Sequence, residues 1–190
     1  IGMALLVFWS ALVAGQNTFS IVHIDSSASA GSGRAIFETP SGYLLFSALN
    51  DLETGRTWLY TAHLDQTGAI LGTHAFGSSC FMDPGVVDAI ASNPDGTFTA
   101  AVSHFLSGRR DSLVLFHFTA EGDTISTHFI AAELSLGTRD CVRTVDGNYL
   151  LAGWRTFSED PLEEWPCLTK VTPTGQELWR VATPGYWNYY

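Results

Sequence analysis

Three related stretches decide the fold, and the clearest of them is CVRTVDGNYLLAGW (141–154). The other two are AIFETPSGYLLFSA (35–48) and AIASNPDGTFTAAV (89–102). Each passes from an apolar run into a turn ending in glycine, then an aromatic residue, then small and apolar residues. The glycines of these turns are Gly42, Gly96 and Gly147, which stand 54 and 51 residues apart. This spacing predicts an internal repeat of about 50 residues.

A second pattern keeps the same period further along each copy. It comprises LYTAHLDQTGAIL (59–71), LVLFHFTAEGDTI (113–125) and CLTKVTPTGQELW (167–179). Its glycines are Gly68, Gly122 and Gly175, which stand 54 and 53 residues apart. Two independent patterns with one period indicate three structural units.

Each unit is expected to hold four strands in two hairpins. The runs around each glycine are rich in β-branched and aromatic residues, which favour strands. Glycine accepts the positive φ that tight hairpin turns require. Polar loops over 49–57, 103–111 and 155–165 are expected to join the hairpins within each unit.

The third strand of each unit indicates how the sheets pack. In the first copy, Tyr60, Ala62 and Leu64 alternate with Leu59 and Thr61, so both faces are largely apolar. A sheet with one solvated face would instead alternate apolar and polar residues. The pattern therefore predicts stacked four-stranded sheets: an all-β fold, a β-propeller with blades over about 33–77, 86–130 and 138–182.

The predicted propeller is incomplete, because propellers usually close with 4–8 blades. Residues 17–24 precede the first blade as a fourth strand precedes its successor, so they are expected to form a spare N-terminal strand. Each bare end face would measure roughly 400 Å². We therefore expect the natural protein to continue beyond Tyr190.

The N-terminus has the pattern of an export signal. Residues 3–15 read MALLVFWSALVAG, an apolar run too short to span a bilayer as a helix. Cleavage after Gly15 is expected, so that 1–15 is a signal peptide and 16–190 the propeller. A buried core helix is the alternative interpretation. A secreted or cell-surface location without a transmembrane span follows from the first interpretation.

The charge balance excludes one class of partner, and the cysteines exclude two kinds of site. Nine basic residues against nineteen acidic ones give a net charge of −10, which would repel a nucleic acid. Cys80, Cys141 and Cys167 lack C-x-x-C spacing, so no zinc or redox motif is predicted. Cys141 and Cys167 are expected to be buried thiols, whereas Cys80 lies on a loop between units.

The repeat resembles those of secreted bacterial β-propellers, in particular proteins exported by the type IX secretion route. The resemblance covers about 35–182, and the third copy carries it best. The matching residues are Asp146, Gly147, Tyr149, Leu168, Lys170, Gly175 and Trp179. The resemblance implies an extracellular or surface-attached protein, and it specifies a fold rather than a chemistry.

No catalytic, metal or cofactor site is predicted. His63 and His117, like His74 and His128, occupy repeat-equivalent positions, which favours structural roles over metal binding. Asp65, Asp95 and Asp146 stand at turns and are expected to shape them. The segment 174–179 resembles the tryptophan-docking repeat of quinoprotein dehydrogenases, but that tryptophan occurs only once here.

A binding face is expected on the rim opposite the glycine turns, where the longer loops should lie. Arg34, Asp88 and Arg139 stand eight residues before the first glycine of successive blades, so they should surround the mouth of the channel. With Trp154 and Arg155 they form the candidate binding residues. Salt bridges between blades are the alternative role for these charges.

The predicted function is therefore that of a non-catalytic binding or interaction module for a carbohydrate or protein ligand, with no oligomer expected. A propeller enzyme is one alternative, as a glycoside hydrolase or lyase or as a quinoprotein dehydrogenase. A hydrolase would need paired carboxylates that converge in the channel, and no such pair is recognisable. A purely structural propeller is the other alternative.

Overall fold

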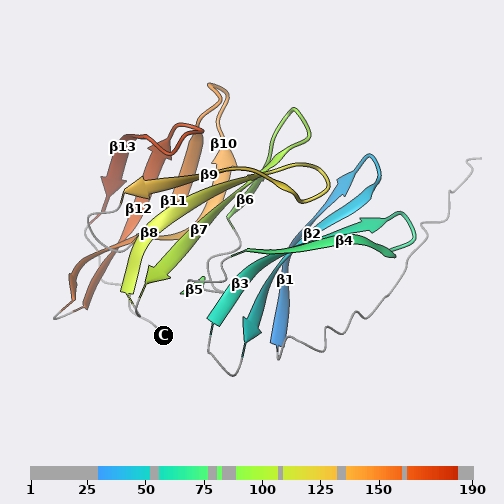
Figure 1. The fold of residues 1–190 in the computed structure, drawn as a ribbon. Helices are drawn as coiled ribbons and strands as arrows, with labels where there is room; N and C mark the ends of the chain where they lie inside the picture. Colours follow the sequence, from blue (N-terminus) through green and yellow to red (C-terminus); the bar gives the residue numbers. More distant parts are fainter. Residues whose placement is uncertain are drawn as a thin grey trace, which may run out of the picture.

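The computed structural model describes residues 30–51, 56–76, 81–82, 89–106, 109–131, 136–159 and 162–183. These residues form three antiparallel sheets and no helix (Figure 1). The predicted signal peptide 1–15 and spare strand 17–24 lie outside the described residues, as do Cys80 and Asp88.

The first sheet is a four-stranded meander. Its strands are β1 (Ala30–Thr39), β2 (Gly42–Asp51), β3 (Arg56–Asp65) and β4 (Ile70–Phe76), and they pair in chain order. The third sheet repeats this order with β10 (Leu136–Arg143), β11 (Tyr149–Glu159), β12 (Leu162–Val171) and β13 (Glu177–Ala182).

The middle sheet has five strands because its first position is filled by two short ones. β6 (Ile90–Ser92) and β5 (Phe81–Met82) both pair with β7 (Phe98–Leu106). β8 (Arg109–Phe118) and β9 (Thr124–Ala131) follow in order. Pro84 and Gly85 stand between β5 and β6 in the sequence, and neither residue favours a strand interior.

The turn glycines confirm the predicted repeat. All six have positive φ, from 81° at Gly147 and Gly175 to 148° at Gly42. Five of the six turns share one pattern of backbone hydrogen bonds. In the turn at Gly147, for example, the amide of Gly147 donates to the carbonyl of Thr144 at 2.9 Å, and the amide of Thr144 donates to the carbonyl of Asn148 at 2.8 Å. A type I turn closed by a glycine bulge explains this geometry.

The expected polar loops 49–57, 103–111 and 155–165 are wrong in extent. The strands continue into them until Asp51 pairs with Arg56, Leu106 with Arg109, and Glu159 with Leu162. Backbone pairing is indifferent to side-chain polarity, so the ladders extend beyond the apolar segments. The connections between these paired strands are therefore shorter than the sequence suggested.

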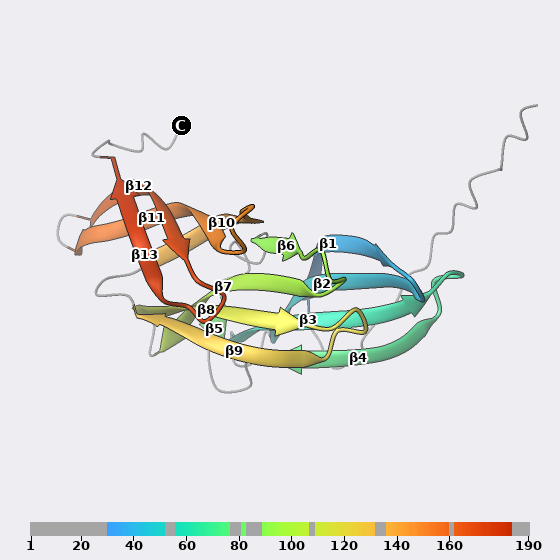
Figure 2. The ribbon, with the colours of Figure 1, turned by 90° about the horizontal axis from the view of Figure 1, so that it is seen from above.

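The sheets pack face to face, with the middle sheet between the other two (Figure 2). One core lies between the first and middle sheets and comprises Leu44, Phe46, Ala48, Leu59, Phe98, Ala100, Val102, Val114, Phe116 and Phe118. A second core lies between the middle and third sheets and includes Leu113, Leu115, Ile130, Cys141, Tyr149, Leu151, Cys167 and Val171. The middle sheet is thus covered on both faces, as predicted, and the fold is an incomplete, propeller-like arrangement that does not close.

Candidate functional site

The candidate site is built around Trp154, midway along β11. Trp154 pairs with Gly137 on the first strand of its sheet, β10. A Cβ atom at Gly137 would collide with the indole ring, so the ring lies directly over that strand. Only 9% of Trp154 is exposed. The glycine at position 137 therefore lets the indole ring lie over β10.

A second glycine brings the two strands together beneath the ring. A Cβ atom at Gly153 would collide with the carbonyl oxygen of Gly137. Both positions therefore need glycine, and larger residues would push β10 and β11 apart. The rigid scaffold fixes the position of the Trp154 ring.

Arg139 completes this platform. The pairing of β10 with β11 shifts register between Thr138 and Asp140, so Arg139 is the extra residue of a β-bulge. A bulge redirects the side chain of its extra residue. The guanidinium carbon of Arg139 lies 4.9 Å from the centre of the Trp154 ring, within the range of a cation–π contact. Arg139 itself is exposed.

Arg34 occupies the equivalent bulge in the first sheet. The register of β1 against β2 shifts between Gly33 and Ala35, which makes Arg34 the extra residue there. The sequence spacing therefore identified two structurally equivalent arginines on first strands. The position of Trp154 in that register is filled by Ala48, which pairs with Ser32.

The structure does not bring all the candidate residues together. Arg155 follows Trp154 on β11, and consecutive strand residues point to opposite faces of the sheet. Trp154 thus lies on the face away from the middle sheet, whereas Arg155 lies on the other face. Asp88 is outside the described residues. The described pair is Arg139 with Trp154.

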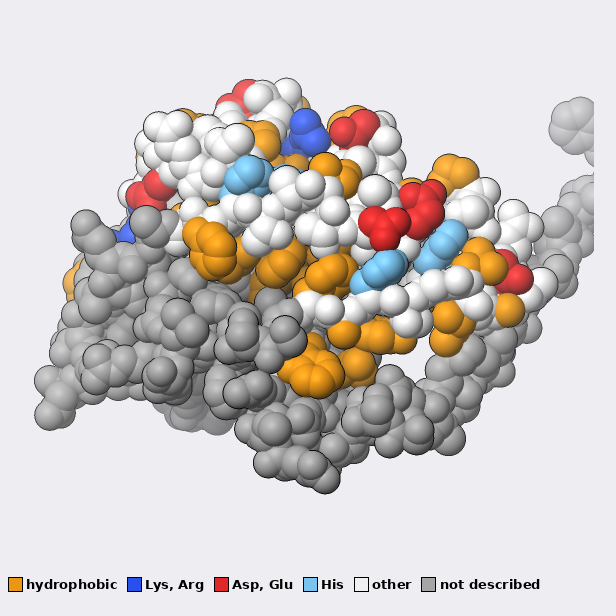
Figure 3. Space-filling view, viewed as in Figure 1, with side chains coloured by type: hydrophobic (Ala, Val, Ile, Leu, Met, Phe, Trp, Pro, Cys, Tyr) orange, Lys and Arg blue, Asp and Glu red, His pale blue; other side chains and the backbone are white. Residues whose placement is uncertain are grey.

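The histidines have structural partners near the glycine turns. His63 Nε2 lies 2.8 Å from Ser41 Oγ, and His74 Nε2 lies 3.2 Å from the carboxylate of Asp123 in the next sheet. His117 Nε2 donates to the carbonyl of Pro173, also in the next sheet, at 2.8 Å. Figure 3 shows histidine and acidic side chains side by side on this part of the surface. Burial lowers the pKa of His117, with smaller contributions from its neighbours.

The three turn aspartates shape their turns, as predicted. Asp65 Oδ1 accepts from the amides of Thr67 at 2.8 Å and Ala69 at 2.9 Å. Asp95 Oδ1 accepts from the hydroxyl of Thr97 at 2.6 Å. These hydrogen bonds hold the pKa of Asp65 and of Asp95 below the ordinary value, because they stabilise the ionised form.

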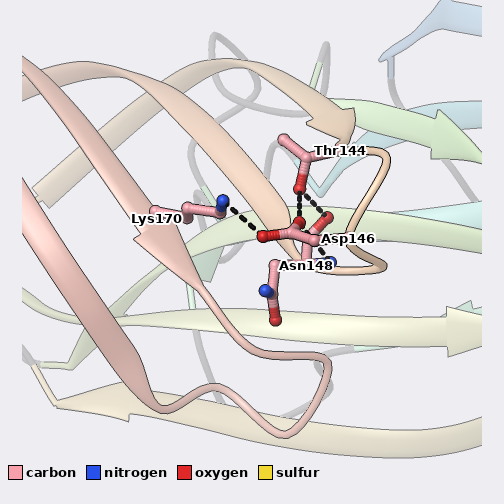
Figure 4. Close-up of polar contacts among 4 residues, drawn as sticks. All are labelled: Thr144, Asp146, Asn148 and Lys170. Atoms are coloured by element: carbon pink, nitrogen blue, oxygen red, sulfur yellow. Dashed lines mark hydrogen bonds and ion pairs between the residues drawn. The ribbon is translucent and has the colours of Figure 1, made fainter.

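Asp146 has an additional partner, Lys170, which replaces His63 and His117 in the repeat. Lys170 Nζ lies 2.6 Å from Asp146 Oδ2, and the hydroxyl of Thr144 and the amide of Asn148 donate to Oδ1 (Figure 4). The bond from Lys170 is the largest cause of a strongly lowered pKa at Asp146.

Cys141 and Cys167 are free and buried, as predicted. Burial, assisted by the charge of Asp140, raises the pKa of Cys141 to about 12. A thiol with so high a pKa holds almost no thiolate at neutral pH and is a poor nucleophile. Cys141 is therefore a packing residue.

Within the described ranges, no group of three or more His, Cys, Asp or Glu side chains is placed to hold a metal ion. The same residues include no helix long and apolar enough to cross a membrane.

Sequence reasoning missed a buried polar network between the middle and third sheets. Tyr149 Oη donates to Asn93 Oδ1 at 2.9 Å, and Thr99 Oγ1 donates to Tyr149 Oη at 2.7 Å. Asn93 Nδ2 donates to Thr99 Oγ1 at 3.1 Å, and His117 Nδ1 lies 2.9 Å from the same oxygen. The available signal was polar Thr99 between apolar residues in a buried strand.

Comparisons with known proteins add little to this geometry. No family model matches the chain, and no curated protein matches it. Among solved structures, a Bacteroides caccae protein of unknown function is similar at 12% identity, with a TM-score of 0.43. The similarity covers 80% of this chain but only 61% of that protein.

Proposed function

We propose that this chain is an exported or surface-attached propeller module that binds a ligand without converting it. The observation that supports this proposal is the Arg139–Trp154 platform. An exposed guanidinium is stacked on an indole that two glycines hold in place. Its orientation before binding reduces the entropy lost when a ligand is captured.

The proposed ligand is a carbohydrate with few charges. The planar guanidinium presents several N–H donors, which suit sugar hydroxyls or an isolated carboxylate. A dense polyanion would be repelled by the net charge of −10. We therefore expect neutral or sparsely charged polysaccharides to bind more tightly than heavily sulfated ones.

A polysaccharide panel tests this proposal. Affinity electrophoresis or calorimetry should detect binding, and an assay for new reducing ends should detect no turnover. Arg139→Gln should weaken binding about tenfold or more, because it removes a charged hydrogen-bond donor. Arg143→Gln is the matched control, since Arg143 is exposed at the turn end of the same strand. Turnover, or unchanged binding by Arg139→Gln, would contradict the proposal.

Export is tested separately. The mature protein, recovered outside the cytoplasm, should begin at Gln16 by N-terminal sequencing. Retention of residues 1–15 inside the cell would contradict an exported module.

A further inference from the structure

The face of the third sheet that points away from the middle sheet is apolar and exposed. Strand alternation turns Cys141, Tyr149 and Leu151 toward the middle sheet, and it turns the intervening residues outward. Two rows cross this outer face: Val142, Leu150, Lys170 and Trp179, then Ala152, Leu168 and Val181. We call these seven residues the trailing face.

The trailing face matches faces that are buried elsewhere in the molecule. Leu168 stands seven residues before its turn glycine, as do Thr61 and Leu115 in the earlier sheets. Thr61 and Leu115 are fully buried against the sheet that follows them, whereas Leu168 is 43% exposed. The same repeat position is thus buried in the two sheets that another sheet follows, and it is exposed in the third sheet.

The opposite end of the molecule has the complementary surface. Ile36 on β1 occupies the repeat position of Cys141, and both lie on the face toward a preceding sheet. Cys141 is 3% exposed because the middle sheet covers it, whereas Ile36 is 59% exposed. Tyr43, Leu45 and Tyr60 are partly exposed and share the face of Ile36 in the strand register. We call these four residues the leading face.

Polar contacts at the two internal junctions indicate how a trailing face meets a leading one. The outer turn of each later sheet lies on the sheet before it. Thr61 Oγ1 donates to the carbonyl of Gly122 at 3.2 Å in the first junction. His117 Nε2 donates to the carbonyl of Pro173 at 2.8 Å in the second. The equivalents at the two ends of the molecule are Lys170 in the third sheet, which also pairs with Asp146 of its own sheet, and the carbonyl of Gln66 in the first.

From this correspondence we propose that two copies of the chain associate head to tail, the trailing face of each on the leading face of the other. Two such junctions are equivalent by a twofold axis and close the assembly. Three sheets from each copy make six, a number within the range of closed propellers. Lys170 of each copy then donates to the carbonyl of Gln66 of the other.

The buried area suits a stable dimer. Four strands about 4.8 Å apart and six residues long make a face of roughly 400 Å². Two junctions with two faces each bury about 1,600 Å², the size of a standard specific interface. The sequence suggested that no oligomer forms and that further chain beyond Tyr190 covers the end faces. In the proposed dimer a second copy covers them instead. It does not depend on the proposed binding function.

Sedimentation equilibrium of the exported protein, with its mature mass measured, tests the proposal directly. At micromolar concentration and about 0.15 M salt we expect a species of twice the chain mass that dissociates on dilution. Higher salt should strengthen it, because two chains of net charge −10 repel each other. A monomer at every concentration and salt would overturn the proposal.

Two variants identify the faces. Leu168→Asp on the trailing face and Ile36→Asp on the leading face should each abolish the dimer, because each alters both junctions. Ile125→Asp is the matched control, since Ile125 is an exposed apolar residue on β9 of the middle sheet. The Ile125→Asp variant should remain a dimer.

Circular dichroism should show β-structure in all three variants. Each substituted residue is exposed within one copy of the chain, so a charge there should not unfold that copy. Loss with Leu168→Asp but not Ile36→Asp would indicate a dimer through two trailing faces and overturn the proposal.

Discussion

The two internal junctions use equivalent repeat positions but are packed in different ways. The junction between the first and middle sheets is aromatic: Phe118 lies 5.4 Å from Phe46 and 5.3 Å from Phe76 between ring centres. At the second junction, the network that joins Tyr149, Asn93 and Thr99 crosses between the sheets. One backbone repeat thus accepts either a ring cluster or a hydrogen-bonded core, provided that every buried polar group has a partner.

The difference follows from two repeat positions. Phe118 and Val171 each stand four residues before a turn glycine, and Phe98 and Tyr149 each stand two residues after one. Smaller Val171 leaves room at the second junction, and the hydroxyl of Tyr149 brings a polar group into it. Asn93 and Thr99 satisfy that group.

The largest expected effect comes from breaking the aromatic junction. Phe118→Ala should destabilise the protein by about 3–5 kcal/mol, because it leaves a cavity where a fully buried ring packs on both neighbours. Val171→Ala removes only two carbons at the equivalent position and should cost about 2 kcal/mol. Urea unfolding followed by circular dichroism measures both values. Equal losses would mean that the two junctions contribute alike.

The next effect tests the polar junction. Tyr149→Phe should cost about 1–3 kcal/mol, because it leaves Asn93 Oδ1 buried without the donor that it accepts from. Tyr60→Phe, at a half-buried position in the first sheet, is the control and should change stability by less than about 0.5 kcal/mol. If the two variants unfold at the same urea concentration, the network adds nothing to stability.

A smaller effect concerns pH at the same junction. The folded pKa of His117 is lowered by burial, so folding favours the neutral ring. The resulting stability is full above the unfolded pKa of about 6.5 and is lost as the pH falls below it. The loss should stay below about 1 kcal/mol, because the ring is only half-buried and partly screened. In His117→Gln, the urea midpoints of unfolding at pH 7.5 and pH 5.0 should lie closer together than in the unsubstituted protein. An equal difference between the two midpoints in both proteins would exclude His117 as the cause.

The smallest effect concerns Lys170, the repeat counterpart of His117. Lys170→Met should raise the pKa of Asp146 toward its ordinary value, because it removes the largest cause of the lowered pKa. A lowered pKa stabilises the fold above the unfolded value of about 3.9, and this contribution is lost as the pH falls. Carbon-13 NMR of the carboxyl groups measures the titration. Asp65, held by its own turn, is the internal control and should not move.

The candidate site shows where prediction from sequence ended. Spacing alone found the equivalent arginines Arg34 and Arg139, and the bulges show that the equivalence is structural. Spacing could not show that Trp154 lies over Gly137, or that Arg155 points to the other face. Those outcomes depend on strand register, which a shift of one residue reverses.

The sequence by itself determined the three repeats, the six turn glycines and the turn aspartates. These features are local: a positive φ excludes most side chains, and an aspartate closes its own turn, whatever lies beyond it. Tertiary structure alone decided how far the ladders extend, how β5 and β6 share one position, and which residues form each junction. Those features depend on residues some 50 positions apart that meet only when one sheet packs on the next.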